Sequence, residues 1–147
     1  MGSNVNSMIN NKQLILKNGG FKMESIGKMY QSGDWKGEKH VPVVHAPETV
    51  KSGEDVDVKV VIGEEIPHPN ELEHHIVWIK LYFKPEGGKF PVEIATYNQS
   101  AHGEADLFTR AKVEATFTTE KSGTLYATSY CNIHGLWENS QEIKVEA

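Results

Sequence analysis

Cysteine is almost absent from this sequence, which contains a single one, Cys131, among 147 residues. One cysteine cannot close an internal disulfide, so nothing ties the chain to an oxidising compartment. The opening residues, 1–12, also lack the apolar stretch of a signal peptide. We therefore expect a cytoplasmic protein whose fold depends on its hydrophobic core.

Long apolar runs and an excess of positive charge are missing as well. Every apolar run is far shorter than the ~18 residues of a membrane-spanning helix, which predicts that the chain has no membrane span. The formal net charge of −5 gives no overall attraction to nucleic acid or to an anionic membrane. Any anion that the protein binds must therefore be attracted by a local positive patch.

Alternation of apolar and polar residues begins at Val41 and continues to the C-terminus, which indicates β-strands. No segment predicts an amphipathic helix longer than two turns. The chain has the length of a single domain, and we expect an all-β fold, an immunoglobulin-like β-sandwich of about seven strands. Trp78 can serve as its core aromatic residue, in a strand buried on both faces. After a first strand that follows Val41, strands are expected at 56–62, 75–83, 92–98, 112–119, 124–130 and 141–146.

The first 22 residues differ in composition from the rest, because they are polar and rich in asparagine. We predict a poorly structured N-terminal extension over residues 1–22, whose opening Met-Gly-Ser resembles a cloning remnant. The sandwich domain is then expected over residues 23–147.

Histidine is plentiful, and several histidines stand near strand ends. Cys131 and His134 form a C-x-x-H pair, which can chelate one metal ion but also fits a buried free cysteine beside an unrelated histidine. His68 lies between two prolines, and His74 opens a strand six residues later, so a loop can bring their imidazoles to one site. His75 should point to the opposite face of the strand.

One thiolate and three imidazoles suit several metals. A tetrahedral set would fit a structural zinc site in a non-catalytic module. A blue-copper electron carrier of the cupredoxin kind normally has an axial methionine after its ligating histidine, and no methionine follows Met29. A fourth histidine would favour five- or six-coordinate iron. His40 supplies one, although the stretch Glu38-Lys39-His40 taken alone is equally typical of a charged linker.

Three blocks of this sequence together resemble the superoxide reductase family, in its single-iron neelaredoxin type, which is related to the catalytic domain of desulfoferrodoxin. The blocks are "EKHVP" (38–42), "IPHPNELEHHIVWI" (66–79) and "YCNIHGLW" (130–137). The resemblance covers residues 35–147. Two-iron members of the family carry an additional N-terminal domain with four cysteines, and this sequence lacks those cysteines.

The resemblance implies one mononuclear iron per chain, which alternates between Fe²⁺ and Fe³⁺. It implies that Glu38 occupies the sixth iron position in the ferric state only, and that Lys39 lies over the open ferrous site. It further implies that the thiolate is an axial ligand and that the imidazoles bind in one plane. The implied metal ligands are His40, His68, His74, Cys131 and His134.

The same resemblance implies a reaction and partners. Superoxide would be reduced by one electron to hydrogen peroxide, and a rubredoxin-like protein would return the iron to the ferrous state. Short relatives imply a homotetramer. The backbone amides of Ile133 and His134 are candidates for hydrogen bonds to the thiolate sulfur, and Trp137 is a candidate for core packing or for a docking patch.

Overall fold

The computed structural model describes residues 13–15 and 21–147, and its side chains are described from residue 23 onward. The chain divides into two compact units, of which the first ends at Tyr30. In that unit β1 (Gln13–Ile15) pairs antiparallel with β2 (Phe21–Met23), and the short 3₁₀ helix η2 (Ile26–Met29) follows. The predicted disorder of the extension falls mainly on residues outside those described.

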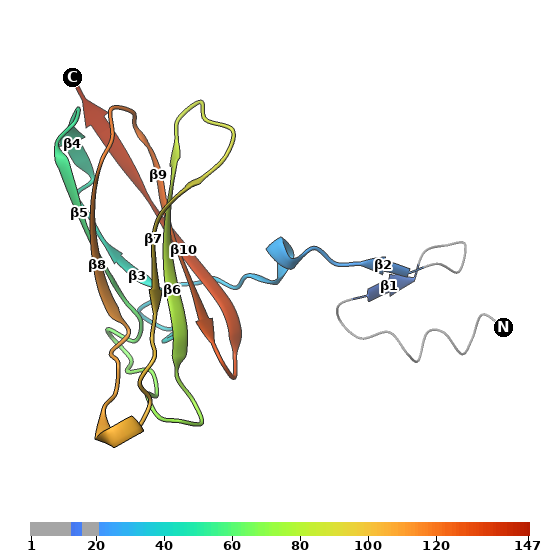
Figure 1. Cartoon of the computed structure of the whole chain (residues 1–147). Helices are drawn as coiled ribbons and strands as arrows, with labels where there is room; N and C mark the ends of the chain where they lie inside the picture. The colour runs from blue at the N-terminus through green and yellow to red at the C-terminus, as the bar shows by residue number, and fades with distance from the viewer. Residues whose placement is uncertain (1–12, 16–20) are drawn as a thin grey trace. The chain divides into compact units, whose positions relative to one another are not determined.

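The second unit, Gln31–Ala147, is a β-sandwich, as predicted (Figure 1). One sheet has five strands in the order β4-β10-β9-β6-β7, and the other has three in the order β3-β5-β8. All pairs in these sheets are antiparallel except β10 with β4. The strands are β3 (Val43–His45), β4 (Thr49–Lys51), β5 (Asp55–Val61), β6 (Ile76–Pro85), β7 (Val92–Asn98), β8 (Lys112–Thr118), β9 (Gly123–Cys131) and β10 (Gly135–Glu146), with the 3₁₀ helix η3 (Glu104–Asp106) between β7 and β8.

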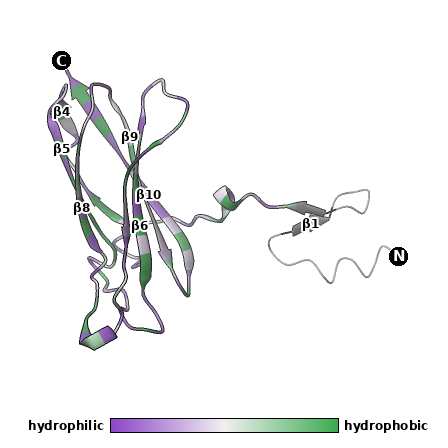
Figure 2. Ribbon diagram, in the orientation of Figure 1, coloured by the Kyte–Doolittle hydropathy of each residue, from purple (hydrophilic) through white to green (hydrophobic). Residues whose placement is uncertain are grey.

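The hydrophobic core lies between the two sheets, because each strand turns every second side chain inward. In β5 the inward residues are Val56, Val58 and Val60, each at most 2% exposed. Figure 2 shows the corresponding alternation of hydrophobic and hydrophilic residues along the strands of the sandwich. Fourteen buried residues form one cluster: Val50, Val56, Val58, Val60, Ile62, Ile76, Ile79, Leu81, Phe83, Val113, Leu125, Ala127, Cys131 and Ile143.

Strand β6 corrects two expectations. It is not buried on both faces: Ile79 and Leu81 are fully buried, whereas Trp78 and Lys80 are half-buried on the other face. Trp78 is therefore not the core aromatic residue, and the Lys80 ammonium lies 4.5 Å from its ring centroid instead. A register shift between Ile76 and Trp78 changes the phase of the alternation there, as a β-bulge does.

Three connecting segments meet at one end of the sandwich (Figure 1). The turn between β9 and β10 brings Gly135 opposite Cys131, and Ile76 at the start of β6 pairs with the same cysteine. The lead-in to β3 reaches this end too, because Val43 pairs with Val61 at the end of β5. No helix among the described residues is long and apolar enough to cross a membrane.

Candidate metal centre

The structure brings a thiol and three imidazoles together at this end of the sandwich. The ligand atoms of His40, His68, His74 and Cys131 all lie within 4.8 Å of one another. They come from the lead-in to β3, the loop before β6 and the end of β9. His134, from the β9–β10 turn, lies beside them.

The turn that carries His134 folds back onto the cysteine. Cys131 is fully buried, and the His134 backbone N–H donates a hydrogen bond to its sulfur at 3.4 Å. The bond expected from the Ile133 amide is not found in the part of the chain that the structure describes. Gly135 closes the turn with φ +85°, a left-handed conformation that glycine adopts without strain.

The four imidazole rings follow one another around a common centre. His40 neighbours His68 at 4.8 Å between ring centroids, and His68 neighbours His74 at 4.7 Å. His74 neighbours His134 at 5.0 Å, and His134 returns to His40 at 4.6 Å. The centroids of His40 and His74 are 6.3 Å apart, as the diagonal of a square must exceed its sides.

The nitrogens that face this centre have spacings that suit a shared ion. His134 Nδ1 lies 3.1 Å from His40 Nε2, 3.3 Å from His74 Nε2 and 3.8 Å from the Cys131 sulfur. Two nitrogens bound to one ion at ~2.1 Å and at right angles would be ~3.0 Å apart. His40 and His74 therefore face the centre through Nε2, and His134 faces it through Nδ1.

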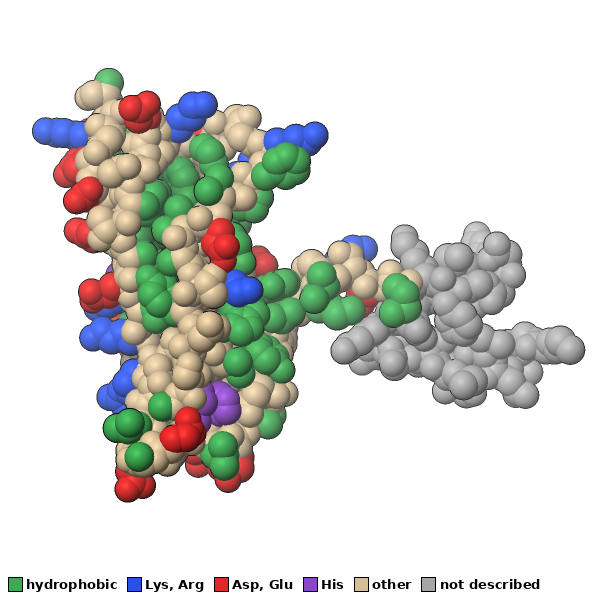
Figure 3. Space-filling view, viewed as in Figure 1, with side chains coloured by type: hydrophobic (Ala, Val, Ile, Leu, Met, Phe, Trp, Pro, Cys, Tyr) green, Lys and Arg blue, Asp and Glu red, His purple; other side chains and the backbone are tan. Residues whose placement is uncertain are grey.

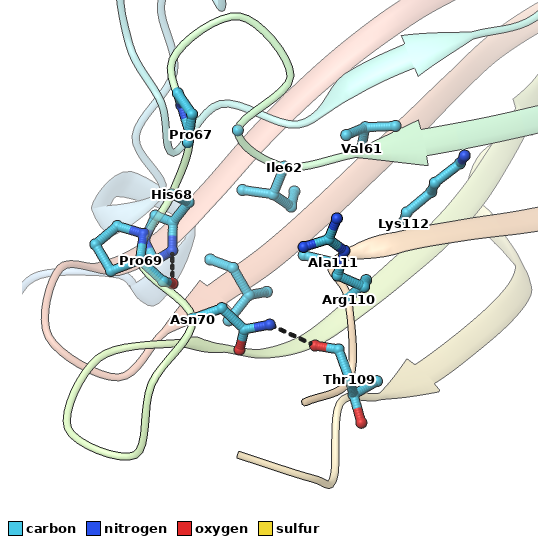
Figure 4. Close-up of a pocket in the computed structure, with 12 residues that line it drawn as sticks. Val61, Ile62, Pro67, His68, Pro69, Asn70, Thr109, Arg110, Ala111 and Lys112 are labelled. Carbon is cyan, nitrogen blue, oxygen red and sulfur yellow. Dashed lines mark hydrogen bonds between the residues drawn. The ribbon is translucent and has the colours of Figure 1, made fainter. Parts of the chain in front are cut away.

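The outer ring nitrogens of two histidines are held by hydrogen bonds that fix the tautomer. His68 Nδ1–H donates to the Pro69 carbonyl at 2.7 Å (Figure 4), and His40 Nδ1–H donates to a Glu38 carboxylate oxygen at 2.7 Å. Both bonds leave the lone pair on Nε2. His68 Nε2 is buried and has no hydrogen-bond partner, which is costly unless a metal uses it.

The electrostatics of the cluster favour the neutral form of His68 and His74. Burial lowers the pKa of His68 to about 4, with smaller contributions from His40, His74 and Lys39. The pKa of His74 is also lowered, by burial first and then by the charges of His134, His40 and Lys39. A neutral imidazole keeps the lone pair that a metal needs.

Glu38 and Lys39 border the cluster in different ways. Glu38 does not point to the centre: its carboxylate accepts bonds from the backbone N–H and the Nδ1–H of His40, and the side-chain bond lowers its pKa. Lys39 is half-buried, and among the described residues it makes no ion pair. Its positive charge nevertheless contributes to the lowered pKa of both His68 and His74.

Two further side chains support the cluster. The Trp137 ring stacks on His40, with 4.8 Å between centroids and 14° between planes, and Trp137 is only 7% exposed. Of its two expected roles, the structure therefore shows packing. Gln31 donates from its side chain to the His134 carbonyl at 2.8 Å. No sequence signal reveals Gln31, because it lies 103 residues from His134 in the chain.

The remaining histidines lie outside the cluster. His75 lies away from the cluster and stacks on His102 with 3.5 Å between ring centroids. Since β6 begins only at Ile76, the side-chain alternation of a strand does not explain this placement. His45 bonds to the carboxylate of Glu64.

His68 links the cluster to a neighbouring pocket. A pocket of about 380 Å³ opens nearby, but His68 is its only lining residue from the cluster, and its wall continues through Ile62 to Arg110 and Lys112 (Figure 4). Figure 3 shows histidine at the surface on one face of the sandwich. Within the cluster, His134 is exposed. A small solute can therefore reach the cluster from solvent.

The fold and the cluster define a small β-sandwich protein with a group of histidines and one thiol that could hold a metal ion. The desulfoferrodoxin family model matches residues 32–140, and the chain belongs to this family, as its three sequence blocks predicted. It is 53% identical over 114 residues to the superoxide reductase of Pyrococcus horikoshii, covering 78% of this chain and 95% of that protein. It is 42% identical over 125 residues to the neelaredoxin of Megalodesulfovibrio gigas, covering 80% and 96%. The solved structure of superoxide reductase (neelaredoxin) from Archaeoglobus fulgidus in the reduced form matches with a TM-score of 0.72 at 46% identity, over 78% of this chain and 98% of that one.

Proposed function

We propose that this chain is a superoxide reductase, which reduces superoxide to hydrogen peroxide at a single non-haem iron. The observation that carries the proposal is the convergence of one buried thiol and four imidazoles on a common centre. The chain matches nearly the whole length of relatives that are named superoxide reductase and neelaredoxin. These names support superoxide reduction as the activity of this chain.

The residues that would hold the iron are His40, His68, His74, Cys131 and His134. Histidine nitrogens and a thiolate are suitable donors for iron, and five of them leave one of six positions for a substrate. Iron in this site would supply the single electron, and the thiolate would tune the potential at which it does so. The buried, unpartnered Nε2 of His68 supports occupation of the site by a metal.

Lys39 would attract the substrate. Superoxide is an anion and the chain carries a net charge of −5, so the reaction needs a local cation. Lys39 fits this role because its charge acts on His74 and it makes no ion pair among the described side chains, although its charge also helps to lower the pKa of Glu38. Superoxide takes up one electron and two protons to give hydrogen peroxide, and solvent around Lys39 would deliver the protons.

Glu38 would have two positions. In the structure it orients His40 through the Nδ1–H bond. We propose that it reaches the iron only in the ferric state, as the family resemblance implies, so that the sixth position is closed after the electron has been transferred.

The alternatives are less well supported. A structural zinc site takes four ligands, which leaves one of the five convergent donors unexplained. A cupredoxin-like carrier would need an axial ligand where the sequence has no methionine after Met29. The proposal also includes a cytoplasmic location, a rubredoxin-like electron donor and a homotetrameric assembly.

The test is to load the protein with ferrous iron, mix it with superoxide and follow both the iron and the products. A superoxide reductase oxidises one iron per chain and forms hydrogen peroxide without releasing dioxygen. Release of dioxygen beyond that from spontaneous dismutation measured without protein would refute the proposal. Purification of a colourless zinc protein or a blue copper protein with no superoxide activity when loaded with iron would refute it as well.

A further inference from the structure

Asn132 lies in the turn between β9 and β10, and its side chain connects that turn to the loop before β6. Its Oδ1 accepts a hydrogen bond from the His75 backbone N–H at 2.9 Å, and its Nδ2 donates to the Glu73 carbonyl at 3.0 Å. Its own backbone N–H donates to the His75 carbonyl at 3.2 Å. The two side-chain bonds go to the residues immediately before and after His74.

These bonds complete the hydrogen bonding of the backbone around His74. The His74 N–H donates to the Glu71 carbonyl at 3.2 Å, and the Glu71 N–H donates to the His74 carbonyl at 3.0 Å. With the three bonds of Asn132, each backbone polar group from the Glu73 carbonyl to the His75 carbonyl has a partner. The segment lies outside β6, so no strand ladder would hold it in place of Asn132.

We propose that Asn132 is a positioning residue, which sets the distance between His74 and the turn that carries Cys131 and His134. The inference rests on the proposed metal site. His74 Nε2 must stay near His134 Nδ1, at 3.3 Å in the structure, although the two histidines belong to separate loops. A carboxamide has a donor and an acceptor at a fixed spacing in one plane, so it can bond to both peptide groups beside His74 at once.

The proposal predicts a loss of metal affinity. Groups that orient metal ligands typically contribute about 10–100-fold to affinity. We therefore expect Asn132→Ala to weaken binding of Co²⁺ by about tenfold or more. Cobalt serves as the probe because the Cys131 thiolate should give a charge-transfer absorption in each variant, which makes binding measurable by competition with a chelator and independent of superoxide chemistry.

A double-mutant cycle with His74→Ala separates positioning from general loosening. If Asn132 acts through His74, Asn132→Ala weakens Co²⁺ binding in the wild-type background and has no further effect in the His74→Ala background. An equal loss in both backgrounds would mean that the whole turn is loosened, and an unchanged affinity in the wild-type background would mean that Asn132 orients nothing. Either result would overturn the proposal.

The matched control is Gln141→Ala. Gln141 also donates from a side-chain amide to a backbone carbonyl, that of Ala46 at 3.0 Å, but that bond does not hold a segment beside His74. The control should bind Co²⁺ as the wild type does. If urea unfolding shows that Asn132→Ala is not folded, Asn132→Asp replaces it. This variant retains an acceptor for the His75 N–H and loses the donor to the Glu73 carbonyl. It too should lose Co²⁺ affinity only when His74 is present. A wild-type protein that fails to bind metal would refute the proposed site itself, whereas normal wild-type binding with an unaffected Asn132→Ala refutes only the role of Asn132.

Discussion

Trp137 contacts two histidines of the cluster in two different ways. Its indole ring stacks on the His40 imidazole at 14°, and its indole N–H donates to the His134 backbone carbonyl at 3.2 Å. Trp137, which belongs to β10, thus links the lead-in to β3 with the β9–β10 turn.

Replacing this indole should therefore affect both stability and the metal site. Trp137 is 7% exposed, and Trp137→Ala should lower the free energy of unfolding of the metal-free protein by about 3–5 kcal/mol, because a large buried side chain leaves a cavity. Trp137→Phe retains an aromatic ring against His40 but has no N–H donor. Its free energy of unfolding should therefore fall by less than that of Trp137→Ala. Urea unfolding of the three proteins measures the difference. Equal stability of wild type and Trp137→Ala would contradict the packing role.

Cys131→Ser should remove the visible charge-transfer absorption of the oxidised iron protein. Serine retains the size of the side chain but replaces the sulfur whose electrons the transition requires. The spectrum of the ferric protein, recorded at matched iron content, is the measurement. If the visible band survives in Cys131→Ser, the sulfur is not bound to iron. A variant that binds no iron is examined by its Co²⁺ spectrum, which should lack the corresponding thiolate band.

The sequence predicted the sandwich because strand alternation is a local pattern. It predicted the cluster only through the resemblance of three short blocks to a known family, since the residue spacings alone were equally compatible with a free cysteine and a charged linker. Alternation in strands such as β5 follows from the two-residue period of a strand, and His40, His68 and Cys131 lie in short recognisable blocks. The features that the sequence did not predict depend on strand register and on contacts between residues far apart in the chain. The outward position of Trp78 follows from a register shift, and the contacts of Gln31 with His134 and of Asn132 with Glu73 join residues far apart in the chain.

Lys39→Ala should slow the second-order reaction of the ferrous protein with superoxide. Removing the cation that attracts the anion should lower the rate about tenfold at low ionic strength and flatten its dependence on salt, because screening has less attraction to remove. Stopped-flow or pulse-radiolysis rates over a range of salt concentrations provide the measurement.

Lys36→Ala is the matched control for this charge. Lys36 is exposed, and its ammonium lies 5.6 Å from the Trp35 ring centroid rather than among the histidines. The control changes the net charge by the same amount and should leave the rate near that of the wild type. Equal rates for Lys39→Ala and wild type at low salt would exclude the proposed role of Lys39.

The free energy of unfolding of the metal-free protein should fall as the pH is lowered between the pKa of His68 in the unfolded chain and its pKa in the folded protein. Burial holds the folded-state pKa of His68 at about 4, whereas a histidine in the unfolded chain titrates near pH ~6.5. Between these values the unfolded chain binds the proton and the folded chain does not, so His68 destabilises the fold progressively from about pH 6.5 down to about pH 4 and adds no further loss below that. Urea unfolding across this range should show a shallower pH dependence for His68→Gln than for the wild type, because the variant has no proton to take up at this position. Identical slopes for the two proteins would show that His68 does not titrate differently in the folded and unfolded states.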